Sequence, residues 1–125
     1  MSEVLRRPPA YIRSLVAFYS LMDLRSLRAQ APAAVDDEVL ERFSPVVALG
    51  ATSGNLPPIF VGRAGLDMPI LNATADQFIE MASKRNLLVS IRNHPEGFHG
   101  FDIRNDDAFS RDIIRQAFEF LKAHT

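Results

Sequence analysis

Three short, nearly unbroken apolar runs most constrain what this chain can fold into. They are residues 12–21 (IRSLVAFYSL), 58–62 (PIFVG) and 87–92 (LLVSIR). Continuous runs, without the alternation of a half-buried strand, are typical of strands that are covered on both faces in parallel sheets. Parallel strands need crossover connections, and segments with helical periodicity separate and follow the runs. The sequence therefore predicts a three-layer α/β fold, with a short, mainly parallel sheet flanked by helices.

Three helical segments accompany the expected strands. Each has an Asp or Asn at a suitable N-cap position and apolar residues at a spacing of three or four. Residues 22–35 are less regular, and we expect a short helix and a loop there, ended by Pro32. The expected helices are DEVLERF, capped by Asp36 or Asp37, with Val39, Leu40 and Phe43 on one face; about 73–85, capped by Asn72, with Phe78, Ile79 and Ala82 inward; and a last helix capped by Asn105 or Asp106, in which Phe109, Ile113, Ala117, Phe120 and Leu121 recur at helical spacing.

The first run, residues 12–21, is the most hydrophobic of the three and raises a question about partners. Three strands make a thin sheet for a fold with helices on both faces. A strand of this kind at a free edge would present unpaired N–H and C=O groups beside apolar side chains. We therefore expect this run to find a neighbour, either in a homo-oligomer or in a complementing N-terminal half.

Composition excludes several classes of function. The 125 residues are expected to form a single domain, 1–125, with 47% hydrophobic and 23% charged residues. The net charge of −1 gives no basic surface for nucleic acid or anionic membranes. The chain contains no cysteine, which excludes disulfides, thiolate metal sites and a cysteine nucleophile. No apolar stretch is long enough to span a membrane and the N-terminus has no signal-peptide core, so a cytoplasmic location is expected.

Reactive side chains follow two of the expected strands. Asp67 lies in GRAGLDMP, directly after run 58–62, and His99 lies in NHPEGFHGFD, directly after run 87–92. Ligands of open parallel sheets bind at the carboxyl ends of the strands, and adjacent strands are about 4.8 Å apart. The two loops can therefore meet. An Asp that fixes the tautomer of a His, whose other ring nitrogen takes a proton from a nucleophile, is the acid–base half of a hydrolytic triad.

These stretches resemble a known family. PPIFVGRAGLDMPILN, NHPEGFHGFD and the terminal amphipathic helix are similar to the C-terminal part of an α/β-hydrolase, in the manner of dienelactone hydrolases and small esterases. IRSLVAFYSLMDLR resembles the strand after the nucleophile strand, and LERFSPVVAL resembles a connecting segment of that family. The resemblance runs from about Pro8 to the end. It implies hydrolysis of a carboxylic ester or lactone without a cofactor, with Asp67 as the triad acid and His99 as the general base.

The sequence departs from the family at the nucleophile. The family's serine sits in G-x-S-x-G between a strand and a helix, and its oxyanion donors lie beside that serine and in an earlier loop. No G-x-S-x-G occurs here. GATSG (residues 50–54) has Thr52 at the centre and precedes a strand, and Ser20 lacks flanking glycines. We therefore expect the C-terminal half of a hydrolase that is inactive on its own. The alternative is a non-catalytic assembly module that oligomerises through its first strand.

Other uses of the same residues remain open at this stage. His99 could donate to a backbone carbonyl, and Asp67 could serve only to form its turn. Arg63 and Arg92 could bind a carboxylate substrate or form structural ion pairs. A metal site is a further alternative, although its spacing fits no standard motif. Its ligands would be His94, Glu96, His99 and Asp102.

Overall fold

The computed structural model describes residues 1–125 and contains one three-stranded parallel sheet. Its strands are β1 (Leu15–Phe18), β2 (Ile59–Ala64) and β3 (Val89–His94), in the order β1-β2-β3. In the register of the sheet, Ile59 lies opposite both Leu15 and Val89. All three strands thus run in the same direction, and their carboxyl ends meet at one edge. The predicted α/β fold class is confirmed.

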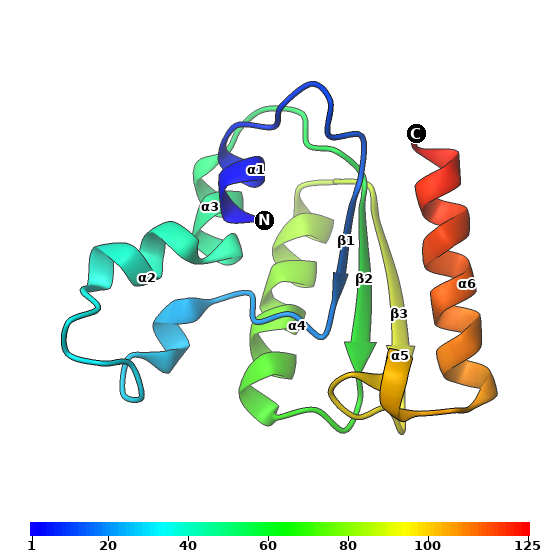
Figure 1. Cartoon of the computed structure of the whole chain (residues 1–125). Helices are drawn as coiled ribbons and strands as arrows, with labels where there is room; N and C mark the ends of the chain where they lie inside the picture. Colours follow the sequence, from blue (N-terminus) through cyan, green and yellow to red (C-terminus); the bar gives the residue numbers. More distant parts are fainter.

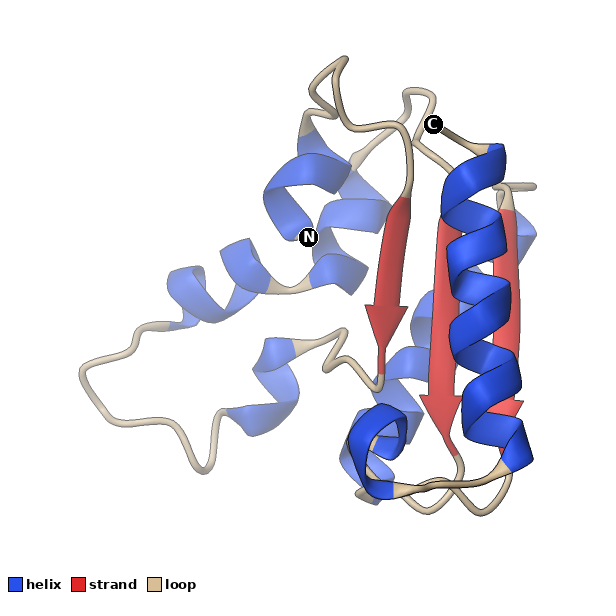
Figure 2. Cartoon of the chain, turned by 45° about the vertical axis from the view of Figure 1, so that its right-hand side comes forward, coloured by secondary structure: helices blue, strands red, loops and turns tan.

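Helices cover both faces of the sheet (Figures 1 and 2). One face carries α4 (Pro69–Lys84); α3 (Pro45–Ala51) packs on α4, and α1 (Ser2–Arg6) packs on α3. The other face carries α6 (Ala108–Ala123). The remaining helices are the short η1 (Leu24–Leu27) and α2 (Asp37–Phe43), which project sideways beyond β1, and α5 (Phe101–Arg104), which lies at the carboxyl ends of the strands. No helix is long and apolar enough to cross a bilayer.

The central strand β2 separates two hydrophobic cores. Ile59 and Val61 point into the core beneath α4, whereas Phe60 and Ala64 point into the core beneath α6. Alternate residues of a strand face opposite sides of a sheet, so a strand with both faces covered must be apolar throughout. This is why run 58–62 shows no polar alternation. The α4 core includes Leu5, Leu49 and Phe78, and the α6 core includes Phe101, Ile113, Ala117 and Phe120.

Several predicted boundaries were wrong. The first strand covers Leu15–Phe18 only, not the whole of residues 12–21. Helix α4 begins at Pro69, earlier than 73, because proline at the first helical position suits the start of a helix. Its cap is Met68, and the side chain of Asn72 instead donates to the Gly65 carbonyl at 3.4 Å.

The caps of the other two predicted helices differ in outcome. Helix α6 is capped by Asp107, not by Asn105 or Asp106. Asp36 does cap α2, as predicted.

The apolar faces of two helices are narrower than predicted. In α2 only Leu40 is buried, while Val39 and Phe43 are exposed. In α6 the side chain of Phe109, the second residue of the helix, is also exposed. The sequence analysis did not identify α1, α3 and α5 as helices. The helices α1 and α5 have only five and four residues, too few for helical periodicity. The helix α3 has seven residues, as α2 does, but Ser44 makes no side-chain cap hydrogen bond at its start.

His94 anchors α6 to the end of β3. Its ring is buried and packs at a tilt against Phe101 and Phe109, at centroid distances of 5.4 and 5.6 Å. Its Nε2 lies 3.0 Å from Asp107 Oδ1. Asp107 also accepts a 2.8 Å hydrogen bond from the Ser110 N–H as the α6 N-cap. The hydrogen bond from the Ser110 N–H is the main cause that lowers the pKa of the Asp107 carboxyl below its ordinary value, and His94 lowers it further. One carboxylate therefore fixes both the start of α6 and the buried imidazole.

Backbone hydrogen bonds clasp the loops that follow β2 and β3. The Gly65 N–H donates to the His94 carbonyl at 2.8 Å, and the Leu66 N–H donates to the Gly97 carbonyl at 2.9 Å. Gly65 allows this close approach, because a Cβ atom there would overlap the Pro95 carbonyl oxygen and lie 2.8 Å from that of His94. The two loops are thus held together at the carboxyl edge of the sheet.

We expect Gly65→Ala to destabilise the protein by about 1–3 kcal/mol, because the added methyl group must displace backbone rather than a flexible side chain. Urea unfolding followed by circular dichroism measures this change. Gly54→Ala is the matched control, since a Cβ atom at that position has no neighbour within 4 Å. Equal midpoints for the two variants would show that the close approach of the loops is unimportant for stability.

We expect Asp107→Asn to make the free energy of unfolding depend less on pH at acid pH. A carboxyl whose pKa is lowered on folding stabilises the protein above its unfolded pKa, and this contribution is lost as pH falls through the folded value, below about pH 4. Asn still caps helices well, so the substitution tests mainly the charge. Unfolding free energies measured from pH 6 down to about pH 2 report the slope. Asp106→Asn removes the same charge from an exposed neighbour, and an identical effect there would contradict the assignment.

Candidate functional site

Asp67 and His99 meet at the carboxyl edge of the sheet. Asp67 closes the turn after β2, and its side chain is only 1% exposed. Its Oδ2 lies 3.0 Å from Nδ1 of His99, and its Oδ1 accepts the Met68 N–H at 2.7 Å. The His99 side chain is 51% exposed, and no protein group hydrogen-bonds its Nε2. The expected contact is therefore present, with the carboxylate buried and the far ring nitrogen open.

This arrangement fixes the chemistry that the pair can perform. A carboxylate on Nδ1 holds the proton there, so the lone pair on Nε2 points outward as a base. Once Nε2 takes up a proton, the buried Asp67 carboxylate stabilises the resulting imidazolium. Neither ring nitrogen of His99 donates to a backbone carbonyl. Asp67 does form its turn through Met68, but its second oxygen remains for His99. Their catalytic roles stay predictions.

Tyr19 is part of the site, although the sequence analysis did not select it. It directly follows β1, and its ring centroid lies 4.6 Å from that of His99. Its hydroxyl donates to Asp102 Oδ1 at 2.8 Å. Burial, and then the bond and charge of Asp102, raise the pKa of the Tyr19 phenol. The only available signal was its place at the carboxyl end of a predicted strand, the same rule that selected Asp67 and His99.

Three of the four residues of the metal alternative have separate partners. His94 pairs with Asp107, His99 pairs with Asp67, and Asp102 accepts the Tyr19 hydroxyl. Glu96 is exposed and makes no side-chain hydrogen bond. No group of three or more His, Asp or Glu side chains is arranged to hold a metal ion. His94, His99 and Asp102 thus belong to three separate pairs.

The two arginines at the strand ends are used within the protein. Arg63 forms a two-pronged ion pair with Asp76 at 2.8 and 3.1 Å and also donates to Asn93. Arg92 donates to the Gln116 side chain and to its neighbouring carbonyl, that of Ile91. Arg63 therefore forms a structural ion pair, the second of the two predicted uses. Arg92 is held by hydrogen bonds to uncharged groups and forms no ion pair.

Neither hydroxyl considered as a nucleophile has the setting of one. Thr52 caps the end of α3, donates to the Leu5 and Ala48 carbonyls, and lies in the segment that leads into the start of β2. Ser20 donates to the Phe18 carbonyl at 3.1 Å, at the end of β1. The strand β2 itself separates Thr52 from His99, because one precedes the strand and the other lies at its far end.

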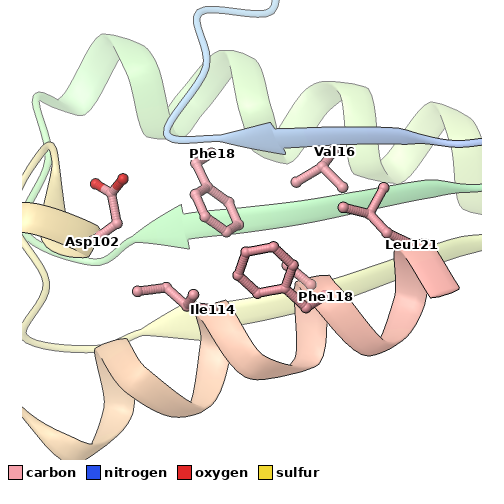
Figure 3. Close-up of a pocket in the computed structure, with 7 residues that line it drawn as sticks. Val16, Phe18, Asp102, Ile114, Phe118 and Leu121 are labelled. Atoms are coloured by element: carbon pink, nitrogen blue, oxygen red, sulfur yellow. The ribbon is translucent and has the colours of Figure 1, made fainter.

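An apolar pocket of about 280 Å³ opens between the free edge of β1 and α6 (Figure 3). Asp102, the partner of Tyr19, lies at the end of the pocket toward α5. Because β1 pairs only with β2, its other edge carries no strand. The pocket is lined by Val16 and Phe18 from β1, Ile114, Ala117, Phe118 and Leu121 from α6, and Asp102 from α5.

Comparisons with known proteins place the fold. No family model matches the sequence, and no curated protein matches it significantly. An esterase from the Planctomycetes species Thermogutta terrifontis is similar in structure, with a TM-score of 0.67 and 18% identity over 87% of this chain and 41% of the esterase. An acylaminoacyl peptidase from Pyrococcus horikoshii is similar with a TM-score of 0.77 and 13% identity, over 97% of this chain and 21% of the peptidase.

Both similar structures have the α/β-hydrolase fold. This chain spans less than half the length of either protein. Its three parallel strands with helices on both faces therefore correspond to part of an α/β-hydrolase fold.

Proposed function

We propose that this chain supplies the acid and the general base of an α/β-hydrolase that acts on carboxylic esters or lactones. The observation that carries the proposal is the 3.0 Å pair of a buried Asp67 carboxylate and a half-exposed His99 imidazole at the carboxyl edge of the sheet. The similarity to an esterase and a peptidase of this fold supports the reaction class. The dienelactone hydrolase and small esterase resemblance supports a small ester or lactone as the substrate.

In the proposed mechanism the nucleophile is a serine outside residues 1–125. Nε2 of His99 removes the hydroxyl proton as the serine attacks the ester carbonyl, and Asp67 stabilises the imidazolium that forms. His99 then returns the proton to the leaving alcohol, which leaves an acyl-enzyme. Water attacks this intermediate by the same two proton transfers. The oxyanion donors would lie beside the serine and in an earlier loop, so they too would come from outside these residues.

The similar esterase suggests which substrate to try first. It has been crystallised with butyrate bound and in a form phosphorylated by paraoxon. Esters with short acyl chains are therefore a suitable probe for this chain. Organophosphates are a second probe, because phosphorylation would report a nucleophile directly.

We expect residues 1–125 alone to show negligible turnover of p-nitrophenyl acetate, because each oxyanion donor is typically worth about 10²–10³ in rate and the chain has no serine elbow. The absorbance of released p-nitrophenolate, compared with that produced by free imidazole at the same concentration, measures this. Hydrolysis that survives in Asp67→Ala/His99→Ala would be generic or due to a contaminant. Robust turnover lost in His99→Ala would instead show that a nucleophile lies within these residues.

The DNA sequence upstream of Met1 tests whether a nucleophile serine belongs to the same protein. An in-frame G-x-S-x-G about twenty to forty residues before Tyr11 supports the proposal, and the longer product should hydrolyse the same ester. In that product, Asp67→Asn and His99→Ala should each lower kcat by about 10²–10⁴. Asp106→Asn is the control, since that exposed carboxyl lies away from the pair. An upstream frame without the motif would favour the second candidate.

A second candidate function is an assembly module in which the Asp–His pair is a relic. The free edge of β1 favours it. Leu15 and Tyr19 donate their N–H groups toward β2, so the N–H groups of Val16 and Phe18 face the open side. The side chains of Val16 and Phe18 also line the apolar pocket. An open edge beside an apolar pocket is the kind of surface that pairs with another strand.

We expect the chain to self-associate through β1. Sedimentation velocity at micromolar concentration should show a species larger than 13.9 kDa. Val16→Lys should shift it toward the monomer, because a charge on an edge strand opposes pairing. Val39→Lys on α2 is the matched control, since the two valines are 37% and 40% exposed. A monodisperse monomer for the unaltered chain would contradict the prediction.

A further inference from the structure

Tyr19 adopts a backbone conformation that its side chain does not favour. Its φ is +38°, whereas most residues outside glycine avoid positive φ, and an aromatic residue there is an outlier. The surrounding structure holds it in place: its N–H donates to the Gly62 carbonyl at 2.7 Å, directly after the last pair of β1 with β2. Such strain persists where neighbouring contacts fix it and is concentrated at functional sites.

This conformation places the Tyr19 side chain against the loop that carries His99. The two rings lie 4.6 Å apart at an interplanar angle of 58°, and Phe101 packs edge-on against the phenol ring at 5.7 Å. The phenol hydroxyl donates to Asp102, in the first turn of α5, at 2.8 Å. Tyr19 therefore joins the end of β1 to residues on both sides of Gly100.

His99 has need of such a contact. Its side chain is half-exposed and is held by a single hydrogen bond, from Nδ1 to Asp67. One hydrogen bond fixes a point but leaves the ring free to pivot about it, which would change the direction in which Nε2 points. A ring packed against the imidazole removes that freedom. Correct direction matters, because proton transfer requires the base to lie within hydrogen-bond reach of its target.

We propose that Tyr19 is a positioning residue for His99: its ring, held in place by the hydrogen bond to Asp102, keeps Nδ1 of His99 on Asp67 and Nε2 facing outward. This inference rests on the proposed function, since it concerns the same general base. Asp102 thereby has a role in the site that differs from metal binding. Its carboxylate holds the tyrosine and does not touch His99 in a hydrogen bond.

Long-range ¹H–¹⁵N NMR on the ¹⁵N-labelled full chain tests the proposal, because it distinguishes the two neutral tautomers of each histidine. At about pH 9, above the ordinary histidine pKa, His99 should be protonated on Nδ1. His94, whose Nε2 faces Asp107, should be protonated on Nε2 and serves as a control in the same spectrum.

We expect Tyr19→Leu to lower the ratio of Nδ1–H to Nε2–H tautomers of His99 by about two- to tenfold, the equilibrium change that loss of an aromatic contact gives. The His94 signals should not move. Tyr19→Phe removes the hydroxyl that donates to Asp102 but keeps the aromatic ring, and Asp102→Ala removes the acceptor of the same hydrogen bond but leaves Tyr19 unchanged. Both variants should therefore lower the tautomer ratio of His99 by the same amount, which should be smaller than in Tyr19→Leu. These two variants test the proposal if Tyr19→Leu does not fold.

Two results would overturn different statements. If His99 in the unaltered chain is protonated on Nε2, the Asp67 pair is not formed in solution and the proposed function fails with it. If His99 is protonated on Nδ1 and the ratio is unchanged in all folded variants, the pair stands and only the role of Tyr19 is lost. Movement of His94 together with His99 would also count against the proposal, because it would show a general loosening of the loop.

Discussion

The backbone clasp between the loops after β2 and β3 determines the geometry of everything at the carboxyl edge. It consists of two hydrogen bonds, from Gly65 to His94 and from Leu66 to Gly97, and it depends on the absence of a side chain at Gly65. Asp67 follows the clasp by one residue on one side, and His99 follows it by two residues on the other. Their contact is therefore a consequence of backbone pairing, since only short stretches of chain separate each side chain from a fixed hydrogen bond.

The carboxyl edge of the sheet holds two Asp–His pairs that differ in which partner is buried. In the Asp67–His99 pair the carboxylate is enclosed and the imidazole is open, so the ring can exchange a proton with a ligand. In the His94–Asp107 pair the imidazole is enclosed between two phenylalanine rings, so it cannot reach a substrate. Residue type alone therefore does not separate a candidate base from a structural anchor. Burial of each member of the pair does.

The parts of the structure that were predictable depend on simple periodic signals. Continuous apolar runs predicted the parallel strands because β2 is covered on both faces, and the rule of carboxyl ends predicted that Asp67 and His99 would meet. The cap of α6 was misplaced because three polar residues in a row, Asn105 to Asp107, all suit a helix start, and only burial of His94 selects Asp107. Tyr19 was missed because its role depends on φ and on the contact with His99, neither of which leaves a periodic trace.

The two candidate functions compete for the same edge of β1. A strand added beside β1 in parallel would have its carboxyl end next to Tyr19 and His99, so a serine in the turn after that strand would lie beside the open Nε2 of His99. A second copy of the chain paired by two-fold symmetry would run antiparallel, and its own carboxyl edge would lie at the opposite end. Self-pairing of β1 would then occupy the only free edge on that side of β2 without bringing a nucleophile to His99. Occupation of this edge therefore separates an enzyme component from an assembly module.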